Sequence, residues 1–237
     1  MVLWQILGQS VNPIFFSPPL RVAARFQQLW IDGTLPSETY VTLYTVIIGF
    51  LISALVGIPL GLVLGRSKSS EYALDPYVNL IYATPIVAII PLVAIWFGSS
   101  ILSSYLIVFL TTMFPILINT LAGVKDVNKS LLETGRSFGF GGISLWRKVV
   151  LPGSVPYIMG GLRVGMGAAV IGALLAEIFL FYAGLGYTIV FGLSEFDTSG
   201  IISAVLLTMA LGIGLTEGVK YIERRTSSWS RGAVGLV

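Results

Sequence analysis

Residues 126–152 read DVNKSLLETGRSFGFGGISLWRKVVLP and form a charged segment between apolar sequences. Its charged side chains are Asp126, Lys129, Glu133, Arg136, Arg147 and Lys148. Residues 76–124 before it carry no charge, and another apolar run begins near Pro156. Because charged side chains are costly in hydrocarbon, we predict that residues 125–152 are a water-exposed loop on one side of a membrane.

The composition supports a membrane location. Of the 237 residues, 55% are hydrophobic and only 11% are charged, whereas soluble domains average about 25% charged residues. The chain has no Cys and no His, which excludes thiol nucleophiles, disulfides and histidine general bases. No basic stripe lies outside the segments that flank the membrane, so nucleic-acid binding has no support.

Apolar runs long enough to cross a bilayer, which takes about 20 helical residues, divide the chain. They cover residues 39–65, 74–97, 101–123, 156–182 and 200–221. We therefore predict an all-α, polytopic membrane helical bundle with about five full spans. This transmembrane domain, 39–222, follows an N-terminal segment, 1–38, and precedes a tail, 223–237.

The N-terminal segment holds two shorter elements. Residues 21–30 (RVAARFQQLW) have the pattern of a short amphipathic helix at the membrane surface. Residues 1–8 are apolar but too short to span the bilayer. They are either the remnant of a first span or an interfacial piece.

The basic residues indicate an orientation. With the loop 125–152 in the cytoplasm, residues 66–75, Arg163 and the tail also face inside, which places 12 of the 14 basic residues there. The loop 183–199 then faces outward with Glu195 and Asp197 and no basic residue. Basic residues concentrate on the cytoplasmic side of membrane proteins, so we expect a multi-pass plasma (inner) membrane protein with a cytoplasmic C-terminus.

Two ionisable residues lie clearly inside the spans, Arg163 and Glu177. Fourteen positions separate them, so they share a helix face but lie near opposite membrane surfaces, too far apart to pair. They are possible pathway or mouth residues; alternatively each extends to its own interface. We identify no catalytic residue and no metal site. No GxxxxGK[ST] sequence occurs, so we expect no cofactor on this chain and no ATP binding by it.

The charged loop contains a spaced pattern. In order it comprises Glu133, Thr134, Gly135, Gly139, Val149, Leu151 and Pro152. Three residues separate Gly135 from Gly139, nine separate Gly139 from Val149, and one separates Val149 from Leu151. This resembles the EAA loop of binding-protein-dependent ABC importer permeases, E-A-A, three residues, G, nine residues, I, one residue, L-P. Glu133, Gly139, Leu151 and Pro152 match in identity and spacing, while Thr134, Gly135 and Val149 depart conservatively in size.

The resemblance covers the chain from about residue 11 onward. The stretches NPIFFSPPLRV (12–22), VGIPLGLVLGRS (56–67), FPILINTLAGV (114–124) and AEIFLFYAGLGYTI (176–189) look like the nitrate/sulfonate/taurine branch of that family. It implies the type I ABC importer transmembrane fold. The implied partners are two ATP-binding subunits, which would hold the ATP, a second permease copy and a soluble solute-binding protein.

The motif has a physical interpretation. A short helix containing Glu133 is expected to seat in a groove of the ATPase. Gly139 is expected to end that helix with a positive φ. A second helix, about 143–150, would return to the membrane and stop at Pro152. Connections in bundles usually take two to eight residues, so a loop this long needs a reason beyond connecting two spans.

The function implied is import of a small, anionic solute of the nitrate, sulfonate, taurine, bicarbonate or vitamin-precursor class. One alternative is a stand-alone secondary transporter or channel, which would need ionisable groups at mid-membrane or a selectivity filter. Another is a membrane-embedded enzyme, which the missing His and Cys disfavour.

Overall fold

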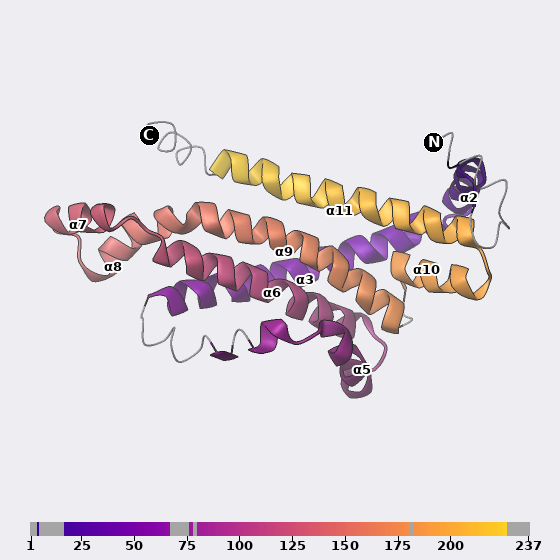
Figure 1. Ribbon diagram of the computed structural model, residues 1–237, viewed down its shortest axis with the longest axis horizontal. Coiled ribbons are helices and arrows are strands. Elements are labelled where there is room, and N and C mark those ends of the chain that lie inside the picture. Colours follow the sequence, from indigo (N-terminus) through magenta and orange to yellow (C-terminus); the bar gives the residue numbers. More distant parts are fainter. Residues whose placement is uncertain (1–3, 5–16, 67–75, 78–79, 181–182, 227–237) are drawn as a thin grey trace. The chain divides into compact units, whose positions relative to one another are not determined.

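The computed structural model describes residues 4, 17–66, 76–77, 80–180 and 183–226. Its elements are all helices: α2 (Pro19–Ile31), α3 (Thr34–Gly65), α5 (Ile86–Phe97), α6 (Ile101–Lys125), α7 (Lys129–Ser137), α8 (Gly142–Leu145), the π-helical turn η1 (Trp146–Val150), α9 (Leu151–Leu180), α10 (Leu185–Ser194) and α11 (Thr198–Thr226) (Figure 1). No strand occurs within these described ranges. The all-α prediction is confirmed.

Four helices of the described chain are long and apolar enough to cross a membrane: Thr34–Gly65, Ile101–Lys125, the continuous run Gly142–Leu180, and Thr198–Thr226. Each contains one of the predicted spans, apart from 181–182, which lie outside the described residues. α3 alone has 32 residues, about 48 Å at 1.5 Å per residue, so it exceeds a hydrocarbon core of about 30 Å.

The span predicted at 74–97 differs. Its longest described helix is α5, which has only 12 residues, because the helix before it breaks at Thr84 and Pro85. A residue that precedes proline is disfavoured in the helical region, so an apolar run need not be one helix. Residues 74–75 and 78–79 lie outside the described part, as do 1–3, 5–16, 67–73 and most of the predicted tail.

The chain forms two compact units. Unit 1 contains residues 1–49, 86–108 and 169–214, and unit 2 contains residues 50–85, 109–168 and 215–237. In unit 1 one apolar cluster joins α5, α6 and α9 through Ile90, Val93, Ile107, Ala176 and Leu180. A second joins α2, α3 and α10 through Leu29, Leu35 and Leu185.

The α2–α3 corner of unit 1 is a polar turn. α2 is the amphipathic helix predicted at 21–30, and it buries Val22 and Leu29. Oδ1 of Asp32 accepts the backbone N–H of Thr34 at 3.0 Å at the start of α3. This hydrogen bond lowers the pKa of Asp32, because it stabilises the ionised carboxylate.

In unit 2, glycines let the helices approach closely. On α3 a Cβ at Gly61 would lie 2.7 Å from the carbonyl oxygen of Leu117, and one at Gly65 would lie 2.6 Å from Cβ of Val124. On α9 a Cβ at Gly161 would lie 2.8 Å from Cβ of Asn119. Small residues at such contacts are typical of membrane helix packing. α6 is therefore held between α3 and α9, and these helices support the charged loop.

Candidate functional site

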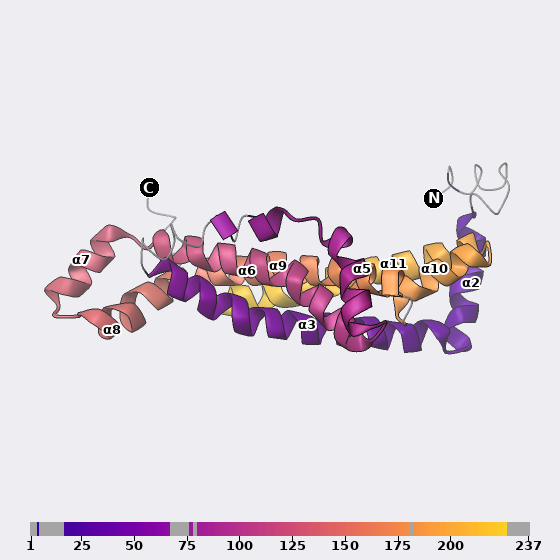
Figure 2. The same cartoon turned by 90° about the horizontal axis from the view of Figure 1, so that it is seen from below.

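The charged loop begins with a capped helix. Oδ1 of Asn128 accepts a hydrogen bond from the backbone N–H of Ser130 at 2.8 Å, which satisfies one of the N–H groups left open at the start of α7. Figure 2 shows α7 and α8 extending past the adjoining ends of α6 and α9 within unit 2. The helix predicted around Glu133 is thus present and projects beyond the packed bundle.

α7 ends as the sequence predicts. Gly139 has φ +79°. Its N–H donates to the carbonyl of Arg136 at 2.9 Å, and the N–H of Phe140 donates to the carbonyl of Gly135 at 3.0 Å. These two bonds form a Schellman motif, which closes a helix through a left-handed residue. The positive φ at Gly139 is confirmed, and it turns the chain back toward the bundle.

The returning segment differs from the prediction. A helix over 143–150 that stops at Pro152 is wrong: α8, η1 and α9 run continuously from Gly142 to Leu180. The reason lies in η1, where the N–H of Leu151 reaches back to the carbonyl of Trp146, five residues earlier. The wider turn lets the chain continue past Pro152, which has no N–H to donate and lies in the first turn of α9.

α7 packs on the returning segment through Gly135, which is buried. A Cβ at this position would lie 2.8 Å from Cδ1 of Leu145 and 3.1 Å from Cγ2 of Val149. Larger side chains would push the two segments apart, because both neighbours already fill the contact. Gly135 and Val149, which are fourteen positions apart in the motif, therefore contact each other.

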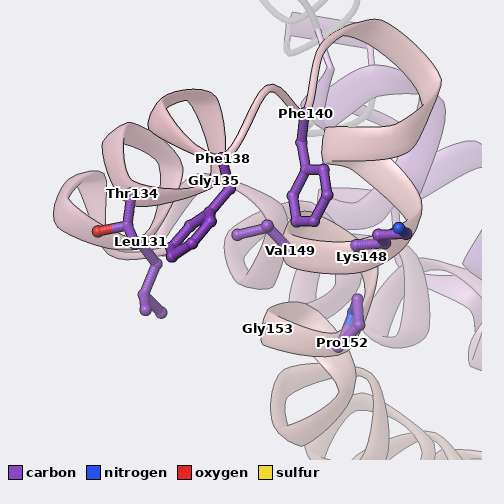
Figure 3. Close-up of a pocket in the computed structure, with 9 residues that line it drawn as sticks. All are labelled: Leu131, Thr134, Gly135, Phe138, Phe140, Lys148, Val149, Pro152 and Gly153. Carbon is purple, nitrogen blue, oxygen red and sulfur yellow. The ribbon is translucent and has the colours of Figure 1, made fainter.

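An open apolar cavity of about 360 Å³ lies at this contact, lined by Leu131, Thr134, Gly135, Phe138, Phe140, Lys148, Val149, Pro152 and Gly153. Figure 3 shows Phe138 and Phe140 on either side of Val149. The Phe138 side chain is 75% exposed and that of Leu131 is 55% exposed. The Nζ atom of Lys148 lies 4.4 Å from the centre of the Phe140 ring, a cation–π distance.

The structure thus gathers part of the predicted motif at one surface. Thr134, Gly135, Val149 and Pro152 line the cavity; Glu133, Gly139 and Leu151 do not. Glu133 is exposed on α7. The motif did not identify Leu131, Phe138, Phe140 and Lys148 as lining residues. The signal that could have found them is large apolar side chains inside an otherwise charged loop.

The base of the loop is anchored in unit 2. Val124, Val127 and Val150 form a buried cluster with Trp146 and Leu132 against it. The hydroxyl of Tyr157 on α9 donates a hydrogen bond to Oδ2 of Asp126. The end of α6 and the start of α9 are therefore joined by apolar packing and by a hydrogen bond at the base of the loop.

The two ionisable residues of the spans have different surroundings. Nη1 of Arg163 lies 3.3 Å from Oε2 of Glu223 on α11, an ion pair within unit 2. Glu177 is only 1% exposed in unit 1 and bonds to α10, as described below. The structure does not bring Arg163 and Glu177 together, as expected from their spacing. Their assignment to a solute pathway stays a prediction.

These observations define a class: a membrane-embedded helical protein with a rigidly anchored helical projection that presents apolar side chains. In the described residues, no group of three or more Asp, Glu, His or Cys could hold a metal ion. The model of a family described as the binding-protein-dependent transport system inner membrane component matches residues 57–228. The chain belongs to this family and is a permease subunit of the ABC importer type.

Individual relatives agree. The taurine transport system permease protein TauC of Escherichia coli is 30% identical over 235 residues, which cover 96% of this chain and 85% of that protein. The formylaminopyrimidine transport permease protein ThiX of Halalkalibacterium halodurans is 28% identical over 232 residues, 98% of this chain and 92% of that protein. Both names describe permeases of transport systems, as the sequence resemblance implied.

The fold also matches a solved structure. An inward-facing structure of the MetNI methionine ABC transporter aligns with a TM-score of 0.73 over 83% of this chain and 97% of that chain, at 16% sequence identity. At this identity the likeness concerns the fold alone. It confirms the predicted type I importer transmembrane fold.

Proposed function

We propose that this chain is the translocation subunit of an ABC importer that moves a small, anionic solute inward across the plasma membrane. Two copies would form the pathway, two separate ATP-binding subunits would dock on the loop 125–152, and a soluble binding protein would deliver the solute outside. ATP would bind and be hydrolysed on the partner subunits, since this sequence contains no phosphate-binding loop.

The observation that carries the proposal is the apolar surface on the charged loop. Phe138, Leu131 and Ile143 are more than half exposed, although residues 126–152, in which they lie, carry six charged side chains. Large apolar side chains exposed to water next to charged ones mark a protein–protein contact. A loop that packs against the helix bundle is suited to transmit a conformational change from a partner subunit, whereas a flexible linker is not.

The distribution of charge supports the proposed orientation. Twelve of the 14 basic residues flank the membrane on the side of the loop 125–152, which favours the cytoplasm for that side. Because the chain has no Cys, a single Ser194→Cys variant can be labelled without background. We expect labelling by an impermeant thiol reagent from outside intact cells. Labelling only from the cytoplasmic side would overturn the orientation.

The solute class rests on the relatives and is tested through the partner. We expect the cognate binding protein to bind one of taurine, an alkanesulfonate, nitrate and bicarbonate, measured by calorimetry. A formylaminopyrimidine, which has no anionic group, is measured beside them. Tight binding of that compound, a cation or a sugar, with no binding of the four, would contradict an anionic solute.

The test of the mechanism is reconstitution. Permease alone, permease with ATPase, and the full set with loaded binding protein are placed in proteoliposomes, and uptake and ATP hydrolysis are measured. We expect no hydrolysis by the permease alone, and uptake only with the full set and ATP. Uptake by the permease alone down an ion gradient would instead establish a secondary transporter.

A further inference from the structure

Three consecutive backbone N–H groups at the start of α10 are each held by a side-chain oxygen from another helix of unit 1. Gly184 donates to Oε2 of Glu38, Leu185 donates to Oγ1 of Thr42 at 2.9 Å, and Gly186 donates to Oε2 of Glu177 at 2.9 Å. The Thr42 hydroxyl in turn donates to Oε2 of Glu177 at 3.0 Å. We call these three side chains the α10 clamp.

The clamp answers a physical need of α10. This helix has 10 residues, about 15 Å, so it is too short to cross a bilayer. A helix start leaves N–H groups without partners, and where this start is buried, other protein groups must accept their hydrogen bonds. Thr42 and Glu177 are both about 1% exposed. The carboxylates also lie at the end of α10 where the helix dipole favours negative charge.

The α10 clamp requires glycine at positions 184 and 186, because it leaves no room for a side chain at either position. Gly184 has φ +107° and ψ 177°, a backbone region open essentially to glycine alone. A Cβ at Gly184 would lie 2.2 Å from Cδ of Glu177, and one at Gly186 would lie 2.7 Å from Cβ of Glu177. The Glu177 carboxylate therefore packs directly against the backbone of Gly184 and Gly186. We expect the position of α10 to depend on this carboxylate.

The far end of α10 is fixed as well. Nε of Arg25 on α2 donates to Oδ2 of Asp197 at 2.7 Å, and Oδ1 of Asp197 accepts the N–H of Gly200 at 2.9 Å. Phe196, which directly precedes Asp197, has φ +55°, a backbone conformation that is uncommon for a bulky residue. Its side chain is 70% exposed. Phe196 is the left-handed residue that closes the C-terminus of α10, because the N–H of Asp197 donates to the carbonyl of Gly192 at 2.8 Å and the N–H of Phe196 donates to that of Leu193 at 3.3 Å.

The face that α10 presents has the anatomy of a binding surface. Phe191, Leu193 and Phe196 are each more than half exposed. Phe191 also lines a cleft of about 720 Å³ between α2 and α10, which contains the carboxylates of Asp32, Glu195 and Asp197 and one guanidinium, that of Arg25. Apolar anchors beside an acidic cleft complement a partner with an apolar patch rimmed by Lys or Arg.

We propose that Glu177, Thr42 and Glu38 are positioning residues that fix α10 as the receiving face for the solute-binding protein. This rests on the proposed function, which places 183–199 outside. The binding protein would present a basic rim to the cleft and an apolar patch to the exposed face of α10. Release of the clamp would misplace this face while leaving the ATPase loop in unit 2 unchanged.

The experiment uses the permease–ATPase complex in nanodiscs, where both faces are accessible. A Thr188→Cys reporter on α10 is buried in the parent, and its labelling rate by a charged thiol reagent reports on the clamp. Thr42→Val removes the hydroxyl at nearly constant shape, and Thr42→Ser restores it. Glu177→Ala and Glu177→Gln form a second pair, since glutamine keeps an accepting oxygen. Glu217→Ala, at an exposed glutamate paired with Lys220, is the control.

Each of Thr42→Val and Glu177→Ala removes two buried hydrogen bonds. We expect both to raise the labelling rate by about tenfold or more. The concentration of cognate binding protein that half-maximally stimulates ATP hydrolysis should rise about fivefold in both, with an unchanged maximal rate. Thr42→Ser, Glu177→Gln and the control should behave like the parent in both assays.

Each of the other outcomes would overturn a stated part of the proposal. Parent-like labelling of Thr42→Val and Glu177→Ala would show that no clamp operates. Faster labelling with unchanged half-saturation would show that α10 is not the receiving face. A lower maximal rate at unchanged half-saturation would instead assign the clamp to a later transport step and overturn the proposal. If binding protein fails to stimulate even the parent complex, the proposed function fails, and the labelling arm still judges the clamp by itself.

Discussion

The two short helices α7 and α10 both connect long membrane helices, and they differ in what surrounds their termini. α7 ends at Gly139, whose added Cβ would meet no atom within 4 Å, and its apolar side chains are exposed. α10 begins at Gly184, whose added Cβ would meet the Glu177 carboxyl at 2.2 Å, and side chains bind its first N–H groups. The C-terminus of α10 closes through a left-handed residue, as that of α7 does. The difference lies at the starts of the helices: the flanking residue Asn128 caps α7, whereas side chains of α3 and α9 bind the first N–H groups of α10.

The largest expected effect is on protein stability, which should fall further when Gly184 is replaced than when Gly139 is replaced. Gly184→Ala places a side chain in a backbone region that costs about 1–3 kcal/mol and adds a clash with Glu177. We expect a total loss of about 3 kcal/mol or more and low membrane levels. Gly139→Ala, in open space, should cost about 1–2 kcal/mol and leave membrane levels unchanged.

The measurement is the thermal midpoint of the detergent-solubilised protein by size-exclusion fluorescence, with immunoblots of membranes. Equal midpoints for Gly184→Ala and Gly139→Ala would show that the two helix ends are not held differently.

A smaller effect concerns the direction of the chain after α7. Gly139→Val should strain the left-handed turn by about 1–2 kcal/mol and misdirect Phe140 and the returning segment. Gly139→Asn should largely retain function, because asparagine visits this region more readily. Solute uptake at matched membrane levels is the readout. Equal uptake by the valine and asparagine variants would mean that the Schellman turn does not set the shape of the loop.

The smallest effect tests the outer face. Glu195→Lys reverses one charge of the exposed acidic cleft on α10 and should raise the half-saturating binding-protein concentration severalfold. Because salt screens exposed charges, the difference should shrink between low and high ionic strength. A salt-independent effect, or none, would remove charge complementarity from the account of this surface.

The sequence predicted what depends on local pattern. Uncharged runs identified the long helices, and the spacing of Glu133, Gly139 and Leu151-Pro152 identified the loop and the left-handed residue that ends α7. It could not show that the π-helical turn at 146–150 carries the helix past Pro152, because that depends on hydrogen-bond register. Nor could it show that Thr42 meets Glu177, since 135 residues separate them and only tertiary packing joins them.

The central claim is that the loop 125–152 receives an ATPase subunit. The most direct measurement is co-purification of the partner ATPase with Glu133→Lys permease, alongside solute uptake at matched membrane levels. Glu133 is exposed on α7, so charge reversal should spare the fold but can cost several kcal/mol at a subunit contact. We predict normal membrane levels, loss of the ATPase and no uptake, while Glu195→Lys on α10 retains the ATPase. A Glu133→Lys permease that binds the ATPase and imports solute like the parent would contradict this account.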